Sequence, residues 1–141
     1  MTSTEIHSFG IEIVYNQIKK DGYEIISVNS QIDMNPQIVA YKDGILAFIE
    51  VRTDIYPKKG VLEEGIHAQI IEHAKKHDAI PYFASVGIAN ADAKTEDERS
   101  IVKRGGKFYI SFEGLLIIAN SDQIKILDKN RIRNISDNDP N

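Results

Sequence analysis

The sequence predicts an α/β fold: a mixed central β-sheet flanked by helices, with elements in the order α-β-β-β-α-β followed by additional β and α elements. Three observations lead to this prediction. An amphipathic helix opens the chain, an Asp-Gly pair at 43–44 joins two strand-like runs, and a second amphipathic stretch separates that hairpin from a buried apolar run. A helix that joins two strands implies a parallel crossover.

Residues 1–133 are expected to form one domain, followed by a polar tail at 134–141. Ser3 or Thr4 is expected to cap the first helix, and Asp21-Gly22 to end it, because glycine suits the left-handed conformation found there. The apolar stripe of this helix consists of Ile6, Phe9, Ile13, Val14 and Ile18.

Five further elements are expected after the first helix. Residues 23–28 read as a strand before the hairpin, and residues 61–77 as a helix. The run 80–88 suits a strand buried on both faces, 92–102 a charged helix, and 107–112 a strand. The buried side of the second helix consists of Leu62, Ile66, Ile70 and Ala74, and short apolar runs follow at 115–119 and 124–127.

The segment 35–52 reads as a hairpin with polar side chains at its open end. If Asp43-Gly44 forms a two-residue loop, paired positions sum to 87 and Gln37 lies opposite Glu50. Side chains alternate along a strand, so Arg52 points to the same side as Glu50. The hairpin therefore gathers Gln37, Glu50 and Arg52 on one face.

This pattern resembles a known signature. Pro36-Gln37 followed by Glu50-Val51-Arg52 is similar to the Pro-Asp and Asp/Glu-x-Lys motifs of the PD-(D/E)XK nuclease superfamily, whose core is the restriction-endonuclease-like fold. Within it the chain is most similar to the small bacterial YraN-like proteins, over about residues 5–87. Their first helix, Gly-Tyr-x-Ile-Leu-x-x-Asn segment, Glu-Ile-Asp strand and Phe-Val-Glu-Val-Lys/Arg strand correspond here to residues 10–18, 22–29, 35–37 and 48–52.

The resemblance implies a metal site with two residues changed. In the superfamily two carboxylates bind a divalent cation, usually Mg²⁺, and a lysine helps to activate the attacking water. The corresponding metal ligands here are Glu50 and Gln37, and the corresponding catalytic residues are Glu50, Arg52 and Gln37. Gln37 offers only a neutral carbonyl oxygen. Arg52 stays protonated, so it can hold a phosphate but cannot accept a proton.

Four other residues are candidates for the periphery of this site. Asp33 lies an even number of residues from Gln37, and Asp54 lies an even number from Glu50, so each side chain would point to the same side as its partner in an extended strand. Either aspartate supplies a carboxylate to the site if a bulge turns it inward. The resemblance adds Glu12, because a first-helix carboxylate approaches the metal in related nucleases, and Gln69, because many members carry a Gln or Lys in that helix. For each of these residues the alternative is a solvated surface side chain.

Composition limits the class of protein. The 141 residues contain no cysteine, which excludes disulfides and thiolate metal sites and suits a cytoplasmic protein. No 18-residue apolar run and no signal-like start occur, so no membrane association is expected. A net charge of -4 argues against a dedicated high-affinity nucleic-acid binder, although a nuclease can bind DNA through its metal and local basic patches.

Three functions remain open. The one we favour is a nuclease-like protein with an eroded catalytic site and weak or no nuclease activity, retained for binding nucleic acid or a protein partner. The second is an active Mg²⁺-dependent endonuclease or DNA-processing enzyme in which Asp33 or Glu12 replaces the missing acid. The third is a non-enzymatic protein-interaction domain. A homo-oligomer is compatible with all three.

Overall fold

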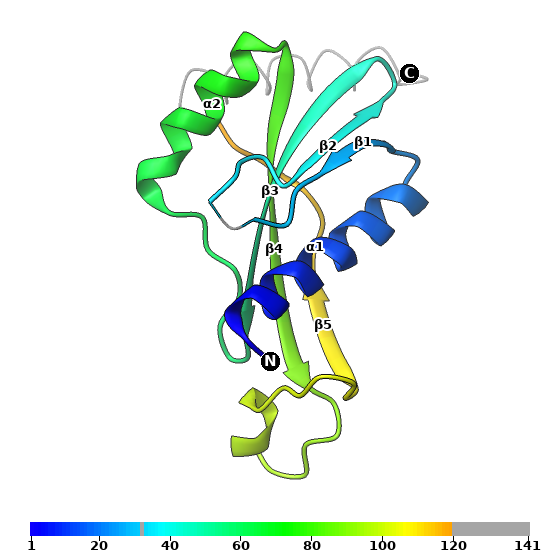
Figure 1. The fold of residues 1–141 in the computed structure, drawn as a ribbon, viewed down its shortest axis with the longest axis vertical. Coiled ribbons are helices and arrows are strands. Elements are labelled where there is room, and N and C mark those ends of the chain that lie inside the picture. Colours follow the sequence, from blue (N-terminus) through cyan, green and yellow to red (C-terminus); the bar gives the residue numbers. More distant parts are fainter. Residues whose placement is uncertain (32, 120–141) are drawn as a thin grey trace, which may run out of the picture.

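The structure, a computed structural model, describes residues 1–31 and 33–119 and has one mixed β-sheet with a helix on each face (Figure 1). The strand order is β1-β2-β3-β4-β5, and β6 pairs with β4. The helices are α1 (Ser3–Lys20), α2 (His67–Lys76) and the 3₁₀ turns η1 (Glu64–Ile66) and η2 (Asp97–Ser100), and the strands are β1 (Glu24–Val28), β2 (Ile38–Lys42), β3 (Ile45–Ile55), β4 (Ala79–Asn90), β5 (Phe108–Phe112) and β6 (Leu116–Ile117). The α/β prediction and its α-β-β-β-α-β order are confirmed.

The β2–β3 hairpin has the predicted register. Asp43 and Gly44 form the loop with φ of 52° and 81°, values that a two-residue turn of this hand requires. Ile38 pairs with Ile49, so paired positions do sum to 87. Strand β2 begins only at Ile38, whereas β3 runs on to Ile55. The second half of β3 therefore has no β2 residue beside it.

Strands β3 and β4 form the centre of the sheet. They are parallel, with Leu46 paired to Ala79 and Ile55 paired to Ile88, and α2 lies in the connection between them. The predicted parallel crossover is therefore confirmed. Strand β5 then pairs antiparallel with the end of β4.

Helix α1 covers one face of the sheet. Its buried residues Ile11, Val14 and Ile18 belong to one apolar cluster with Ile49 and Val51 of β3. These β3 residues have odd numbers, so they share one face of the strand.

Helix α2 covers the opposite face. The ring of Phe48 packs against His73 and His77, with ring centroids 5.1 and 5.6 Å apart. Ile70 forms a second buried cluster with Leu62 and residues near β6. The side chains of the even-numbered residues of β3, including Glu50 and Arg52, therefore leave the strand on the α2 side of the sheet.

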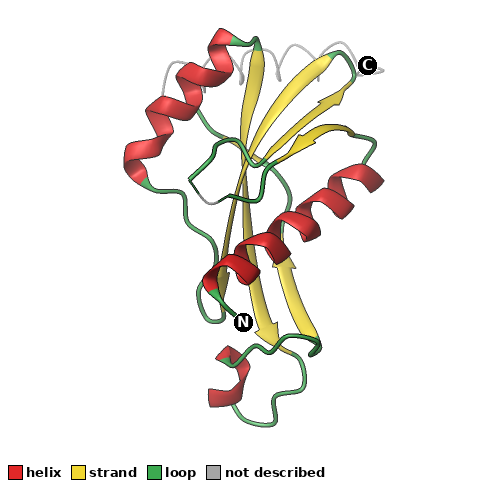
Figure 2. Ribbon diagram, in the orientation of Figure 1, coloured by secondary structure: helices red, strands yellow, loops and turns green. Residues whose placement is uncertain are grey.

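Two of the expected helix boundaries differ from the structure. Thr2 is the N-cap of α1, not Ser3 or Thr4, because it lies three residues before Glu5 and completes a reciprocal capping box. The helix expected at 61–77 begins only at His67, after η1. Figure 2 shows the irregular loop that precedes this helix. Its apolar positions are nevertheless buried or half-buried as expected.

The charged helix expected at 92–102 is wrong, since only the 3₁₀ turn η2 forms there. Side chains compete with the helix for backbone groups. The backbone N–H of Asp92 donates to Asn90, that of Lys94 to the Glu98 carboxylate, and that of Glu98 to Thr95.

The C-terminal predictions lie outside the described residues. They include the run at 124–127, the domain limit at 133 and the polar tail at 134–141. Among the described residues, no helix is long and apolar enough to cross a membrane.

Close packing of α1 on β3 depends on a glycine. A Cβ atom added to Gly10 would lie 1.6 Å from Oγ1 and 2.8 Å from Cβ of Thr53, so rotation of the threonine side chain alone cannot make room. We expect Gly10→Ala to lower the free energy of unfolding by about 1–3 kcal/mol through overpacking. Chemical denaturation measures this change.

Gly65→Ala is the matched control, because a Cβ there meets no atom within 4 Å. This change is expected to alter stability by no more than about 0.5 kcal/mol. Equal effects of the two substitutions would contradict the packing described for α1.

Candidate functional site

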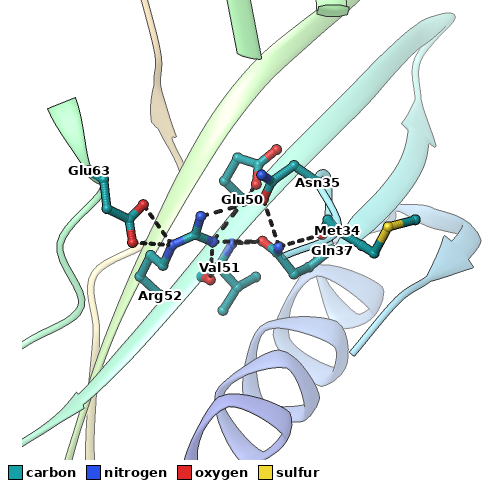
Figure 3. A network of polar contacts seen from close by, with 7 residues as sticks. All are labelled: Met34, Asn35, Gln37, Glu50, Val51, Arg52 and Glu63. Atoms are coloured by element: carbon teal, nitrogen blue, oxygen red, sulfur yellow. Dashed lines mark hydrogen bonds and ion pairs between the residues drawn. The ribbon is translucent and has the colours of Figure 1, made fainter. Parts of the chain in front are cut away.

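The site forms where β2 stops beside β3. Val51 lies two residues beyond Ile49, so its backbone N–H and C=O point to the side where β2 would continue. The residue that would face it in register is Pro36, which has no N–H to donate. Two side chains take over instead. The Val51 N–H donates to Gln37 Oε1 (2.7 Å), and the Val51 C=O accepts from Arg52 Nη1 (2.9 Å) (Figure 3).

Gln37 uses its full hydrogen-bonding capacity within the protein. Its Oε1 accepts from both Val51 N–H and Arg52 Nη1 (3.2 Å), and its Nε2 donates to Met34 O (2.8 Å) and Asn35 Oδ1 (2.9 Å). The side chain is fully buried. An amide has two acceptor lone pairs and two N–H donors, so no acceptor site is left over.

Arg52 is the centre of the network and is itself mostly buried. Its Nε donates to both carboxylate oxygens of Glu63 at 3.2 Å, and its Nη2 donates to Asn35 Oδ1 at 3.4 Å. Its Nη1 lies 3.9 Å from Glu50 Oε2. Partial burial favours a higher pKa for Glu63, but the hydrogen bond from Arg52, a backbone hydrogen bond and the charge of Arg52 together lower that pKa. The guanidinium is thus shared between one exposed and one buried carboxylate.

Glu50 is the unusual member of the group. Its side chain is 1% exposed, and no hydrogen bond to its carboxylate occurs among the described residues. Burial raises the pKa of Glu50 to about 7, even though Arg52 nearby favours the charged form, and Glu63 adds to the rise. The carboxyl group therefore changes its charge near neutral pH.

Glu50 lies on the wall of a small cavity between β3 and α2. The cavity has a volume of about 160 Å³. Its lining contains both polar and apolar side chains and consists of Asn35, Phe48, Glu50, Ile66, Gln69, Ile70 and His73.

A close backbone contact positions the loop that carries Glu63. A Cβ on Gly60 would lie 1.8 Å from the Arg52 carbonyl oxygen, so only glycine permits this approach. The Gly60 N–H donates to Val86 O (3.1 Å), and its C=O accepts from Ser85 Oγ (2.6 Å). The loop is therefore tied to both central strands three residues before Glu63.

Two more buried polar groups lie on the α1 side. His7 is 4% exposed, and its Nε2 has no hydrogen-bond partner in the described part of the chain. Burial lowers the pKa of His7, and the positive charge of Arg52 lowers it further. Thr53 Oγ1, which packs against Gly10, likewise has no partner among the described residues.

The structure brings the predicted motif residues together and leaves most peripheral candidates apart. Gln37 and Glu50 both lie next to Arg52 Nη1, although Gln37 precedes β2 and is not part of the strand. Gln69 lines the cavity beside Glu50. Glu12, Asp33 and Asp54 are exposed, and no hydrogen bond or ion pair described for residues 1–31 and 33–119 joins them to the network.

Sequence reasoning missed Asn35 and Glu63 as members of the site, and also the buried His7 on the α1 side. Asn35 was part of the motif segment but had no role assigned, and Glu63 and His7 were not candidates. The loop that carries Glu63 to Arg52 is held by the Gly60 contact, which no periodic pattern predicts.

The residues present do not fit a Mg²⁺ site of the superfamily type. In residues 1–31 and 33–119 no three His, Cys, Asp or Glu side chains gather in a way that could hold a metal ion. The amide oxygen of Gln37 is already occupied by two donors, and Arg52 lies beside the Glu50 carboxyl group. A hard cation needs several free oxygen ligands, which this arrangement does not offer.

Comparisons with known proteins agree with part of the sequence resemblance. Residues 4–118 match a family described as Domain of unknown function (DUF8840). The chain is also similar to a UPF0102 protein from Alkaliphilus metalliredigens (strain QYMF), with 27% identity over 108 residues that cover 76% of this chain and 94% of the relative. UPF0102 proteins are the YraN family, so this similarity supports a YraN-like protein. Membership of the PD-(D/E)XK superfamily remains a prediction.

The raised pKa of Glu50 predicts a specific pH dependence of stability. The folded state holds this proton more tightly than the unfolded chain, whose pKa is the usual 4.5. The stabilisation is therefore complete below the unfolded pKa and is lost as pH rises toward about 7. Relative to Glu50→Gln, we expect the wild-type chain to lose about 2–3 kcal/mol between about pH 5 and about pH 8.

Urea denaturation of both proteins across this range measures the difference. The comparison concerns only the pH dependence, so a constant offset caused by the substitution does not affect it. Parallel stability curves would show that Glu50 titrates normally.

Proposed function

The chain belongs to the DUF8840 family, whose description assigns no function, so function has to be argued from the chemistry of the site. On this premise we propose that the protein is a nuclease-like protein with an eroded site, which binds nucleic acid and cleaves it poorly or not at all. The similarity to a UPF0102 protein and the motif at 36–52 support the nuclease-like part of this proposal.

The observation that carries the proposal is the saturation of Gln37. The position that the resemblance assigns to a metal-binding aspartate holds a neutral amide whose two acceptor and two donor sites are used inside the protein. The lysine position holds Arg52, which cannot act as a base. Both changes remove a group needed for hydrolysis, and both substituted side chains instead stabilise the end of β3.

The ion pair between Arg52 and the exposed Glu63 side chain supports an anion-binding role for Arg52. Glu63 places both oxygens 3.2 Å from Arg52 Nε, and its side chain is 57% exposed. A phosphate group offers the same kind of anionic oxygens to a guanidinium. Because the Glu63 side chain is exposed, a backbone phosphate can take its place at Arg52 Nε and keep the buried guanidinium paired.

An active endonuclease is less well supported. It would need Asp33 or Glu12 to supply the second carboxylate, and both side chains are exposed and outside the network. The net charge of -4 also limits the strength of binding, so the affinity for nucleic acid is expected to be modest and to fall with salt.

We expect no measurable heat of Mg²⁺ or Mn²⁺ binding in calorimetry and no cleavage of DNA or RNA above a buffer control. The reason is the loss of one ligand charge together with the loss of the base. Robust cleavage that disappears in Glu50→Ala would overturn the proposal and favour an active enzyme.

The double substitution Gln37→Asp with Arg52→Lys tests whether the scaffold still has nuclease geometry. The double substitution restores a second carboxylate and a titratable amine at two positions whose side chains are already in contact. Mg²⁺ affinity is therefore expected to become measurable by the same calorimetry. The single changes are the matched controls, because each restores only one of the two groups. A folded double variant with no metal affinity would argue against a nuclease origin for this site, since ligands need precise support.

A further inference from the structure

The cavity between β3 and α2 has features that metal chemistry does not explain. We propose that it binds one unpaired nucleobase carrying an exocyclic amino group, with the Glu50 carboxyl group as the acceptor for that amino group. This inference rests on the proposed function, because it names the part of a nucleic acid that the same site recognises.

The first argument is the unused hydrogen-bonding capacity of Glu50. Its side chain is buried and lines the cavity, and its Oε2 has no hydrogen-bond partner in the described residues. A buried acceptor without a donor is costly: Oε2 has only Arg52 Nη1 near it, at 3.9 Å, and the Glu50 side chain also lines the cavity. A ligand that brings an N–H group into the cavity would satisfy it.

The second argument is the size and lining of the cavity. A volume of about 160 Å³ is below the roughly 300–1,000 Å³ typical of sites for drug-sized ligands, and it suits a single small ring system. Phe48 and His73 supply aromatic rings, and Ile66 and Ile70 supply an apolar surface. Flat heterocycles bind well against such walls, because their faces are apolar and their edges carry donors and acceptors.

The third argument is the position of the cavity beside Arg52. Asn35 lines the cavity and also accepts from Arg52 Nη2, and Glu50 lies 3.9 Å from Arg52 Nη1. A phosphate that displaces Glu63 from Arg52 therefore lies next to the cavity that would hold a base of the same strand. Phosphate and base would be bound by neighbouring groups, as in other single-strand sites.

The positive charge of Arg52 also argues against a cationic ligand. A lysine or arginine side chain of a protein partner would satisfy Glu50, but it would be repelled by the guanidinium 3.9 Å from that carboxyl group. A neutral amino group of cytosine, adenine or guanine brings the N–H donor without this repulsion. Thymine carries a carbonyl oxygen at the position where cytosine carries its amino group.

Fluorescence anisotropy with labelled single-stranded oligo(dC) and oligo(dT) of about twelve nucleotides tests the inference, a length within the usual range of single-strand sites. The two probes have bases of the same size and equal backbone charge. We expect the wild-type protein to bind oligo(dC) at least about fivefold more tightly, the lower end of the discrimination that one good base contact gives.

Two variants and one control locate the effect. Glu50→Met removes both acceptor oxygens at similar side-chain length and Gln69→Trp fills the cavity, and either is expected to abolish the preference. Glu64→Met makes the same change on an exposed neighbour of the site outside the cavity lining, and the preference is expected to remain. The Gln69 substitution keeps the test valid if Glu50→Met does not fold, because Gln69 is exposed.

The outcomes separate the two levels of the argument. Binding of both probes with equal affinity would overturn the base pocket and leave the proposed nucleic-acid binding intact. A preference that persists in both cavity variants would also overturn the base pocket. Binding of neither probe at low salt would overturn the proposed function together with this inference, and would favour a protein as the partner.

Discussion

The end of β3 depends on two side chains that replace a missing strand. Where β2 stops, the N–H and C=O of Val51 would be left buried without partners, which a folded chain tolerates poorly. Gln37 and Arg52 satisfy both groups and bind each other at 3.2 Å. Because Arg52 is committed there, Asn35, Glu50 and Glu63 take their places around its guanidinium.

This arrangement explains why the site looks like a nuclease site and lacks its chemistry. An aspartate at position 37 would leave a charged oxygen free for a cation, whereas the longer glutamine reaches the Val51 N–H and turns its amide inward. Glu50 keeps the position of a metal ligand but faces Arg52 and a small cavity, so its carboxyl group is easily neutralised. What remains is an arginine that an exposed carboxylate occupies and a buried acceptor without a donor.

The order of the elements, the hairpin register and the parallel crossover could be predicted from the sequence, and the side-chain contacts between distant segments could not. Asp43-Gly44 determined the hairpin register, and that register placed Glu50 and Arg52 on one face. The helix predicted at 92–102 does not form, because the side chains of Asn90 and Thr95 accept hydrogen bonds from backbone N–H groups and so compete with helical hydrogen bonds. Glu63 reaches Arg52, and His7 becomes buried on the α1 side, through tertiary packing, which sequence periodicity does not predict.

The central claim is that Gln37 serves the Val51 backbone and does not bind a metal. Paramagnetic broadening of ¹H–¹⁵N NMR signals by Mn²⁺ tests it most directly, because the Gln37 side-chain amide and the Val51 N–H are both observable. The account predicts that neither signal broadens more than the backbone N–H signals of exposed residues that lie far from any carboxylate, at the same Mn²⁺ concentration. Selective, saturable broadening of these two signals would place a cation at the site and contradict the account.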